Sequence, residues 1–540
     1  MIITNAGKLK LSDHLRIRDL TWMYSGTTLD LDGYVLYLTT NEHAIGSGTV
    51  ISNGGRIMWG DAPVSYYLTV LQGPHGTATV ENTGWHLDGN IVTNTATPDP
   101  GYDLILWQGD VAEADRTNYT VELTMNQTRD VRALFGSTNP TTRTWLGFGS
   151  LYATNPASWY LGQLPVNGDS VALDATSISN LVWDLDVQLT GWNQQTGYDG
   201  IVTIRTRYPS QGGLTNLAIT GNCTIADGTW VHPVNAGTEV YRLKMTVGGD
   251  FFLSTNAVIN LDGRGYSGVA GPGKGVDLQR WGDGTGAAAS YGGRGAYGWV
   301  GVPAACYGTV AAPTNLGSGT SGVGGGALDL QVAGTARVDG TIRAFGTAGS
   351  LHPGSARGSI WMTAGYLEGI GLLVADGAAA SIYGAGGGRV AASLTSGNSV
   401  GGVRMRSLGG IGNGSDHGAA GTVYLQKAAQ GSGQGTLTID NNNTAPNTGV
   451  FTEIPPTLNT LQDLAGMTLI LTNRAYVGLT ANVTMGDLFI RTNTPTRLYL
   501  RGYTLKLTTK FHLDWGNANW VVYEGGQILW AAPGSVYVVY

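Results

Sequence analysis

Apolar and polar residues alternate along much of this chain in short runs that end at glycine. One arrangement occurs three times: an alternating strand, a glycine corner, a second strand, and then Asp-Gly or its equivalent, at 243–263, 328–342 and 360–377. Alternation with a period of two residues predicts a strand that buries one face. Irregular repeats of this kind predict stacked β-coils rather than a compact enzyme domain.

The two ends of the chain carry a matching pattern. An alternating run at 29–38 is followed by Gly54-Gly55, and a run at 498–507 is followed by Gly525-Gly526 at nearly the same spacing. We therefore expect the same type of rung at both ends.

Composition favours strands and turns over helices. Only 12% of residues are charged, and about half of the 85 glycines lie between residues 261 and 430. The net charge is −7 without a basic run, so nucleic acid is not expected as the main partner. No apolar stretch is long enough to predict a membrane span, and the N-terminus lacks the apolar region of a signal peptide.

Residues 65 to 136 interrupt the rungs with a different set of motifs. They contain Thr95-Ala-Thr-Pro98-Asp-Pro100-Gly101-Tyr102, Leu106-Trp107-Gln-Gly109-Asp110 and Val131-Arg-Ala-Leu-Phe135, in that order. This segment resembles the bacterial extracellular repeat related to the internalin B-repeat. The resemblance implies a small β-grasp-like module that serves as a spacer or adhesive unit. Leu104 stands where that family prefers an aromatic residue.

A second resemblance covers residues 155–174. Their Trp159, Gly162, Pro165 and Gly168-Asp169 resemble the opening found in large secreted bacterial β-solenoid proteins. Because an uncapped coil end exposes apolar side chains, we expect Trp159 to cap the end of a solenoid.

These patterns predict an all-β, elongated β-solenoid of β-helix-like rungs, right-handed in type, with an inserted β-grasp-like module and a glycine-rich region. The predicted divisions are N-terminal rungs for attachment (1–64), the B-repeat-like module (65–137), β-solenoid (138–260), glycine-rich β-solenoid with an aromatic insertion (261–430) and C-terminal rungs (431–540).

Acidic residues are the candidates for catalysis. A glycosidase needs two carboxylates about 5 Å apart for retention, or about 6.5–9.5 Å apart for inversion. The candidate pairs are Asp184 with Asp186, which alternate onto one face of a strand, and Glu368 with Asp376 on neighbouring rungs. Asp before Gly is also ordinary turn chemistry, and this second interpretation is favoured.

Aromatic residues inside the glycine-rich segment form the candidate binding set. Aromatic faces on a rigid scaffold suit the recognition of sugar or protein, and the alternative is that they clamp the insertion onto the rod or between subunits. The set consists of Tyr266, Trp281, Tyr291, Tyr297, Trp299 and Tyr307.

No cofactor is predicted. Gly282-Asp283-Gly284 and Asn413-Gly-Ser-Asp416 could supply oxygen ligands to a structural calcium ion, although turns explain them as well. Cys223 and Cys306 could form one disulfide, but two buried free thiols are favoured.

Three functions remain open at this stage. The first is a structural bacteriophage virion protein, a tail fibre or tailspike-like appendage that binds the host surface; the opening Met1-Ile-Ile-Thr-Asn-Ala-Gly-Lys8 resembles those of phage tail proteins. The second is a bacterial surface or filament-forming adhesin, and the third is a polysaccharide depolymerase. Expected partners are copies of the chain, as a trimer, other virion or surface proteins, and a glycan or protein of the host surface.

Overall fold

The computed structural model is built from strands. It describes residues 2–3, 7–18, 20, 22–39, 47–59, 65–276, 286–298, 302, 304–347, 353–458, 464–491, 495–509, 511–512, 520–532 and 535–539. These residues contain no α-helix, and their 3-10 helices are Val80–Asn82, Glu113–Asp115, Pro156–Ser158, Tyr160–Gly162 and Pro209–Gln211. The all-β prediction is confirmed. The chain divides into two compact units, Met1–Phe135 and Gly136–Tyr540.

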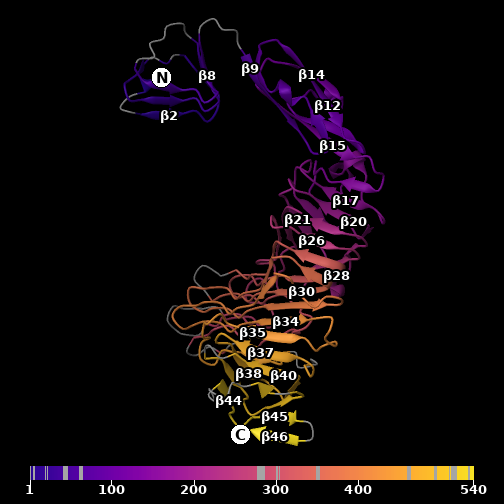
Figure 1. Cartoon of the computed structure of the whole chain (residues 1–540), viewed down its shortest axis with the longest axis vertical. Coiled ribbons are helices and arrows are strands. Elements are labelled where there is room, and N and C mark those ends of the chain that lie inside the picture. The colour runs from indigo at the N-terminus through magenta and orange to yellow at the C-terminus, as the bar shows by residue number, and fades with distance from the viewer. Residues whose placement is uncertain are drawn as a thin grey trace. The chain divides into compact units, whose positions relative to one another are not determined.

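The first unit begins with short strands that pair in parallel. Their orders are β2-β5-β7 and β3-β6-β8, and β1 pairs with β4 (Figure 1). The strands are β1 (Ile2–Ile3), β2 (Lys8–Lys10), β3 (Leu15–Ile17), β4 (Trp22–Met23), β5 (Thr28–Asp30), β6 (Val35–Leu38), β7 (Thr49–Ile51) and β8 (Arg56–Trp59). Leu29, Leu36 and Leu38 are completely buried, so apolar residues of these strands form the core of the rungs.

The rest of the first unit has two sheets, of orders β11-β9-β15-β13 and β10-β12-β14. The strands are β9 (Ser65–Gln72), β10 (Gly76–Ala78), β11 (Gly84–Leu87), β12 (Ile91–Pro98), β13 (Tyr102–Gly109), β14 (Thr120–Thr124) and β15 (Arg129–Ser137). Side chains from both sheets share one core, which includes Trp107 and Phe135. The module thus consists of two packed sheets. It differs from the β-grasp-like fold that the resemblance implies, because a β-grasp fold packs a helix against its sheet.

The second unit has a sixteen-stranded sheet, called here the main sheet, and a seven-stranded second sheet. The path of the main sheet is β16 (Thr142–Thr144), β17 (Ser170–Leu173), β20 (Gly191–Gln194), β23 (Cys223–Ile225), β26 (Phe251–Leu253), β28 (Ala327–Val338), β30 (Ser359–Glu368), β32 (Arg389–Leu394), β34 (Thr422–Gln426), β35 (Thr436–Asp440), β37 (Thr468–Thr472), β40 (Asp487–Ile490) and β43 (Phe511–His512), with β19 (Gln188–Leu189), β22 (Leu217–Ile219) and β25 (Leu243–Val247) as a branch. The second sheet is β18 (Leu181–Trp183), β21 (Ile201–Ile204), β24 (Gly228–Val231), β27 (Ala257–Asn260), β29 (Thr341–Arg343), β31 (Leu372–Val374) and β33 (Arg404–Arg406).

Successive strands of both sheets stack in chain order with parallel pairing, except β34 with β35 (Figure 1). We call one circuit through the sheets a coil. This pairing is the one expected of a β-solenoid. The solenoid itself, its handedness and the domain boundaries remain predictions from the sequence.

The three repeats found in the sequence lie directly on one another. Leu243 pairs with Leu328, and Leu328 pairs with Ile360, and all three side chains are fully buried. The second strand of the repeat stacks in the same way, because Phe251 pairs with Ala336 and Ala336 with Leu367. The repeats therefore contribute equivalent positions to one continuous core.

Glycine is required at the corner between the two strands because adjacent coils approach closely there. A Cβ on Gly248 would lie 2.3 Å from the carbonyl oxygen of Thr220, and a Cβ on Gly365 would lie 2.6 Å from that of Ala333. These are backbone atoms of the preceding coil, so a side chain would force the coils apart.

The closest such approach gives a direct test. A Cβ on Gly358 would lie 1.7 Å from the carbonyl oxygen of Gly326, so Gly358→Ala is expected to destabilise the second unit by about 1–3 kcal/mol. The measurement is chemical denaturation followed by circular dichroism. Gly237→Ala is the matched control, because a Cβ there meets nothing within 4 Å and should change stability little. Equal losses in both variants would contradict the close-packing argument.

The chain reverses direction between β34 and β35, which pair antiparallel. Before the reversal, Val390 and Leu394 face the core that the early coils enclose, called here the first core. Tyr424 and Leu437 instead face a second core, which the later coils enclose. The main sheet is therefore covered on one face by the early coils and on the other face by the late ones.

The late coils add two four-stranded sheets, of orders β36-β38-β41-β44 and β39-β42-β45-β46. The strands are β36 (Thr452–Ile454), β38 (Tyr476–Leu479), β41 (Arg497–Tyr499), β44 (Val521–Val522), β39 (Val483–Met485), β42 (Thr504–Leu507), β45 (Gln527–Ala532) and β46 (Ser535–Val539). All neighbours pair in parallel except β45 with β46.

The rungs at the two ends share a corner. The amide of Tyr34 donates to the Leu31 oxygen at 2.7 Å, and the amide of Tyr503 donates to the Leu500 oxygen at 2.9 Å. The glycine before each tyrosine has a positive φ, +86° in the first corner and +82° in the second. The matching sequence pattern at 29–38 and 498–507 thus corresponds to the same local geometry.

Candidate functional site

The main sheet carries a row of uncharged polar side chains on its outer face. Backbone register aligns these residues across successive coils, and except for Gln188, which is exposed, each is partly buried. The polar members of the row are Gln188, Thr246, Gln331, Thr363, Ser393 and Gln426, and apolar Ala218 lies between Gln188 and Thr246. Parallel strands space such positions about 4.8 Å apart, so the row presents hydroxyl and amide groups at regular intervals from Thr246 to Gln426.

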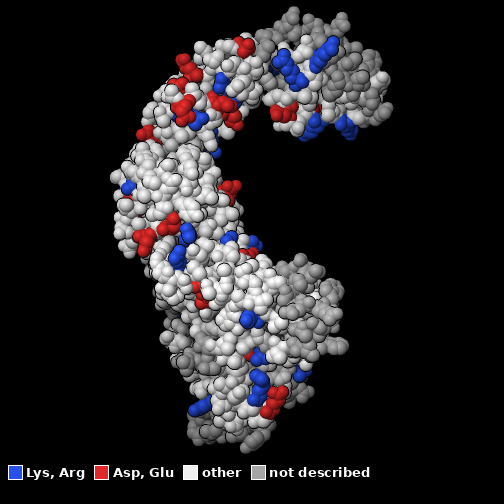
Figure 2. All heavy atoms as spheres, turned by 180° about the vertical axis from the view of Figure 1, so that it is seen from behind, with Lys and Arg blue, Asp and Glu red and all other residues white. Residues whose placement is uncertain are grey.

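A shallow groove of about 470 Å³ runs across this row. No charged residue lines it; the lining is Gln188, Ala218, Ile219, Thr220, Thr246, Val247, Gly248, Gln331, Val332, Ala333, Thr363 and Thr395. Hydroxyl and amide groups donate and accept hydrogen bonds without charge, as the hydroxyls of a neutral sugar do. Figure 2 likewise shows long uncharged areas between scattered charged residues on the face in view.

Sequence reasoning missed this row, although the three repeats contain its signal. Thr246, Gln331 and Thr363 occupy the same outward position in the three copies. Comparing outward positions between copies would have found the row. The groove itself depends on which strands pair across coils, and the pattern does not contain that pairing.

The predicted aromatic set lies in the insertion between β27 and β28, and three of its members are buried. Tyr266, Tyr291 and Tyr307 are 8%, 0% and 3% exposed. The rings of Tyr291 and Tyr307 lie 4.6 Å apart, and the Tyr307 hydroxyl donates to the Leu316 oxygen at 2.6 Å. Burial raises the pKa of both hydroxyls. These three rings therefore cannot contact an external ligand here, and their positions fit the alternative that they hold the insertion in place.

The other members of the set differ. Tyr297 is half-buried, and its hydroxyl donates to the Thr448 oxygen at 3.2 Å. Trp281 and Trp299 lie outside the described residues. The predicted binding role stays a prediction for these three.

Buried charged groups attach the insertion to the coils. Glu453 of β36 is completely buried and accepts hydrogen bonds from Arg294 Nε at 2.7 Å and from the Cys306 amide at 2.9 Å. Arg389 of β32 is also completely buried, and its guanidinium donates two hydrogen bonds to the backbone carbonyl oxygen of Tyr307, at 3.0 and 2.9 Å. Because unpaired buried charges are costly, these contacts fix the position of the insertion.

His232 holds the end of the insertion where it enters β28. It is completely buried; its Nε2 accepts from the Ala327 amide at 3.2 Å, so Nδ1–H donates to the Pro233 oxygen at 2.8 Å. Both ring nitrogens are satisfied only when the ring is neutral. Burial lowers the pKa of His232 to about 3.

Because of His232, we expect the second unit to lose stability in acid. The unfolded ring takes up a proton below its ordinary pKa of 6.5, whereas the folded ring stays neutral down to about 3. Its stabilising contribution is therefore complete above pH 6.5 and falls by up to about 1.4 kcal/mol per pH unit below it. Denaturant unfolding between pH 7.5 and 4.5 measures this, and His232→Asn should give a flatter profile. An unchanged pH profile in the variant would refute the role of His232.

The first pair of candidate catalytic acids follows a strand and does not lie on it. Asp184 and Asp186 come after β18 ends at Trp183, so they do not alternate on one strand face as predicted. Asp184 accepts from the amide and hydroxyl of Thr154 at 3.2 and 3.1 Å. Asp186 is exposed.

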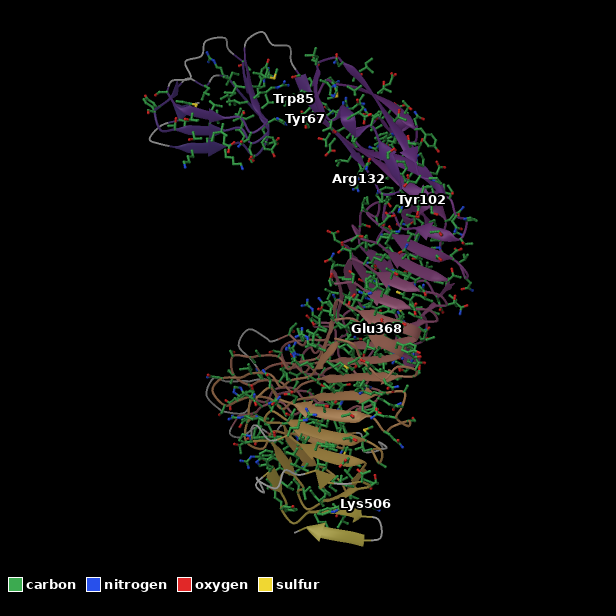
Figure 3. All side chains as sticks on the ribbon, viewed as in Figure 1. Tyr67, Trp85, Tyr102, Arg132, Glu368 and Lys506 are labelled. Atoms are coloured by element: carbon green, nitrogen blue, oxygen red, sulfur yellow. The ribbon has the colours of Figure 1, made fainter. Side chains whose placement is uncertain are left out.

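The second pair is divided between two sheets. Glu368, labelled in Figure 3, ends β30 of the main sheet and is exposed, whereas Asp376 follows β31 of the second sheet. Asp376 forms an ion pair with Arg406 at 2.5 Å and accepts from the Leu408 amide at 2.9 Å. These contacts fit the turn interpretation of Asp376.

The calcium and cysteine predictions concern residues in several loops. Asp283 lies outside the described residues, while Asp416 accepts from the Asn447 amide group at 2.9 Å. Within the described ranges, no three His, Cys, Asp or Glu side chains form a group that could hold a metal ion. Cys223 and Cys306 are buried free thiols, and burial raises the pKa of Cys306 to about 12.

The motifs of residues 65–136 each have a structural role. Trp107 is completely buried, and its Nε1 donates to the Asn118 oxygen at 3.0 Å. Gly109 has a φ of +97°, and a Cβ there would lie 2.0 Å from the Asp130 oxygen. The carboxylate of Asp110 accepts from the Asp130 amide at 3.0 Å. Leu104 is buried in the same core at 7% exposure, although it is not aromatic.

Residues 66–139 match the divergent InlB B-repeat domain. The resemblance of this segment to internalin B-repeats is thereby confirmed. B-repeat domains are generic extracellular modules, so the match indicates an extracellular or surface location. No curated protein and no solved structure matches the chain.

The B-repeat module also has two pairs of partly buried aromatic rings in contact. The rings of Tyr67 and Trp85, labelled in Figure 3, meet edge to face at 5.4 Å, and the Tyr102 ring stacks on His75 at 4.0 Å.

In the described part of the chain, no helix is long and apolar enough to cross a membrane.

Proposed function

We propose that this chain is a structural attachment protein that binds a neutral glycan of a bacterial surface, as a tail fibre or tailspike-like appendage of a bacteriophage virion. The uncharged groove on the main sheet is the observation that carries the proposal. Its hydroxyl and amide row repeats at the spacing of the strands, which suits a ligand that repeats along its own length. The B-repeat module supports display outside a cell.

Binding to saccharides tests the proposal. The labelled chain should bind neutral bacterial surface saccharides on a glycan array, and Thr246→Arg combined with Thr363→Arg should reduce that binding at least about tenfold, because two long cations fill the groove. Thr203→Arg is the matched control, since Thr203 points outward on β21 of the second sheet. Equal loss in both variants, or no saccharide binding by the unaltered chain, would contradict this function.

A bacterial surface adhesin is the second candidate, and it uses the same groove. Its filament-forming version requires coils of one copy to stack on another. At the end of one sheet, β46 pairs antiparallel with β45 and occupies the edge that a stacked strand would use, which weighs against such stacking there. If the chain grows filaments at concentrations at which a trimer would stay discrete, the filament-forming adhesin is favoured. A mass measurement of the native assembly tests the trimer.

A depolymerase is the third candidate. It predicts release of reducing ends from a capsular polysaccharide, lost in Asp184→Asn or Glu368→Gln. A chain that binds the polysaccharide and releases no ends supports attachment alone.

A further inference from the structure

A second groove lies where the second sheet ends and the main sheet continues. The second sheet stops at β33, whereas the main sheet continues through the β34–β35 reversal. Because the later coils cover the opposite face of the main sheet, no further coil follows β33 in the described chain. The end of the first core is therefore left without the strand that would close it.

The free edge of β33 offers backbone groups to a new strand. The Arg404 amide donates to the Gly371 oxygen at 3.0 Å, and the Arg406 oxygen accepts from the Ala375 amide at 2.9 Å. Both residues thus face β31, and in a strand the residue between them faces the other way. The N–H and C=O of Met405 therefore point toward the open edge, and β33 pairs with β31 alone among the described strands.

The groove beside this edge has a volume of about 540 Å³. Its floor includes Met405, Val423 and Leu425, which are only partly buried where they cover the first core. Partly exposed apolar side chains beside a free strand edge are the two features that strand addition requires.

Cations dominate the charges around the groove. Arg404, Arg406 and Lys427 line it, against one carboxylate, Asp440. Arg406 is paired with Asp376, and Asp440 already accepts from the Asn473 side chain at 3.0 Å. The Arg404 and Lys427 side chains have no ion-pair partner within the described residues. The groove therefore favours an anionic occupant.

We propose that this groove binds an extended acidic segment of a partner protein, which adds to the second sheet as a strand beside β33. Arg404 and Arg406 lie two residues apart, so their side chains project to the same side of the strand. An added strand with acidic residues at alternate positions places its carboxylates beside these cations. Its intervening apolar residues then pack toward Met405 and the floor.

The test uses the full chain and three labelled synthetic peptides. Fluorescence anisotropy should show that Glu-Val-Glu-Val-Glu-Val-Glu binds, that its lysine counterpart does not, and that a peptide of the same composition with its glutamates grouped binds more weakly. Raising the salt concentration should weaken binding, because the cations lie near solvent. Arg404→Gln and Lys427→Gln should each weaken it by about fivefold.

Two further variants separate the site from general electrostatics. Met405→Pro removes the N–H that faces the open edge without breaking a bond to β31, so it should weaken binding while the unit stays folded. Lys506→Gln is the charge control; Lys506, labelled in Figure 3, is exposed on β42 in the same unit, and its loss should leave binding unchanged.

Four outcomes would overturn the proposal. The first two are no binding of the alternating acidic peptide and equal weakening by Lys506→Gln and Arg404→Gln. The third is an Arg404-dependent affinity for oligogalacturonate without affinity for the peptide. The fourth is self-association of the chain that Arg404→Gln abolishes, which would assign the groove to a second copy. Neutral saccharides are absent from these assays, so the outcome is independent of the attachment function.

Discussion

Glu453→Ala is expected to lower the free energy of unfolding of the second unit by about 3–5 kcal/mol. The carboxylate is completely buried and receives hydrogen bonds from Arg294, from the Cys306 amide and from the Thr457 amide, the last two at 2.9 Å. Its removal leaves a largely buried guanidinium and two amides without their acceptor. The loss should therefore be concentrated where the insertion meets β36.

Denaturation by urea measures the global effect, and hydrogen exchange at 290–298 and 304–308 measures the local one. Glu368→Ala is the control in the same unit, because Glu368 is exposed and should change stability by less than about 0.5 kcal/mol. Faster exchange in these two segments is expected only in the Glu453 variant. If the two variants lose stability equally, the buried carboxylate does not anchor the insertion.

Trp192→Ala is expected to lower the free energy of unfolding of the second unit by about 3–5 kcal/mol, because it leaves a cavity within a stack of tryptophans at the start of the first core. Trp192 is 1% exposed and meets Trp183 and Trp230 edge to face, at centroid distances of 5.2 and 5.0 Å. The stack continues to Trp159, which is 2% exposed and meets Trp183 at 6.4 Å. The residue expected to cap the coils thus forms part of an aromatic core.

Trp192→Phe is the informative control for this prediction. Nε1 of Trp192 is buried without a hydrogen-bond partner in the described structure, so phenylalanine keeps a ring in the stack and removes an unsatisfied donor. We expect the free energy of unfolding to fall by only about 1–2 kcal/mol. Unfolding is measured by circular dichroism, because the substitutions alter tryptophan fluorescence. A phenylalanine variant as unstable as the alanine variant would show that the ring contacts contribute little.

The two variants probe two different cores of the second unit. Trp192 packs in the first core, whereas Glu453 lies beside the second core, and the reversal between β34 and β35 separates the two. Because each core covers a different face of the main sheet, that sheet has an uncovered face on both sides of the reversal. The two candidate grooves lie on these uncovered surfaces, one across the polar row and one beside β33.

The sequence by itself determined the local structure. Alternation of apolar residues predicted the strands, the glycine corners marked where one strand of a repeat ends, and the motifs around Trp107 and Gly109 identified the B-repeat module. The matching ends were also readable, because a corner with a positive-φ glycine is a local feature. All of these depend on residues that are near one another in the chain.

Only the tertiary structure decided where the functional surfaces lie. The tyrosines of the insertion looked like a binding face, but Tyr266, Tyr291 and Tyr307 are buried, and the contact of Arg389 with the Tyr307 backbone ties the insertion to a distant strand. The antiparallel step after β34 has no local signal, since a strand reads the same in either direction. Pairing across coils sets which residues face outward together, so both grooves follow from contacts between residues far apart in sequence.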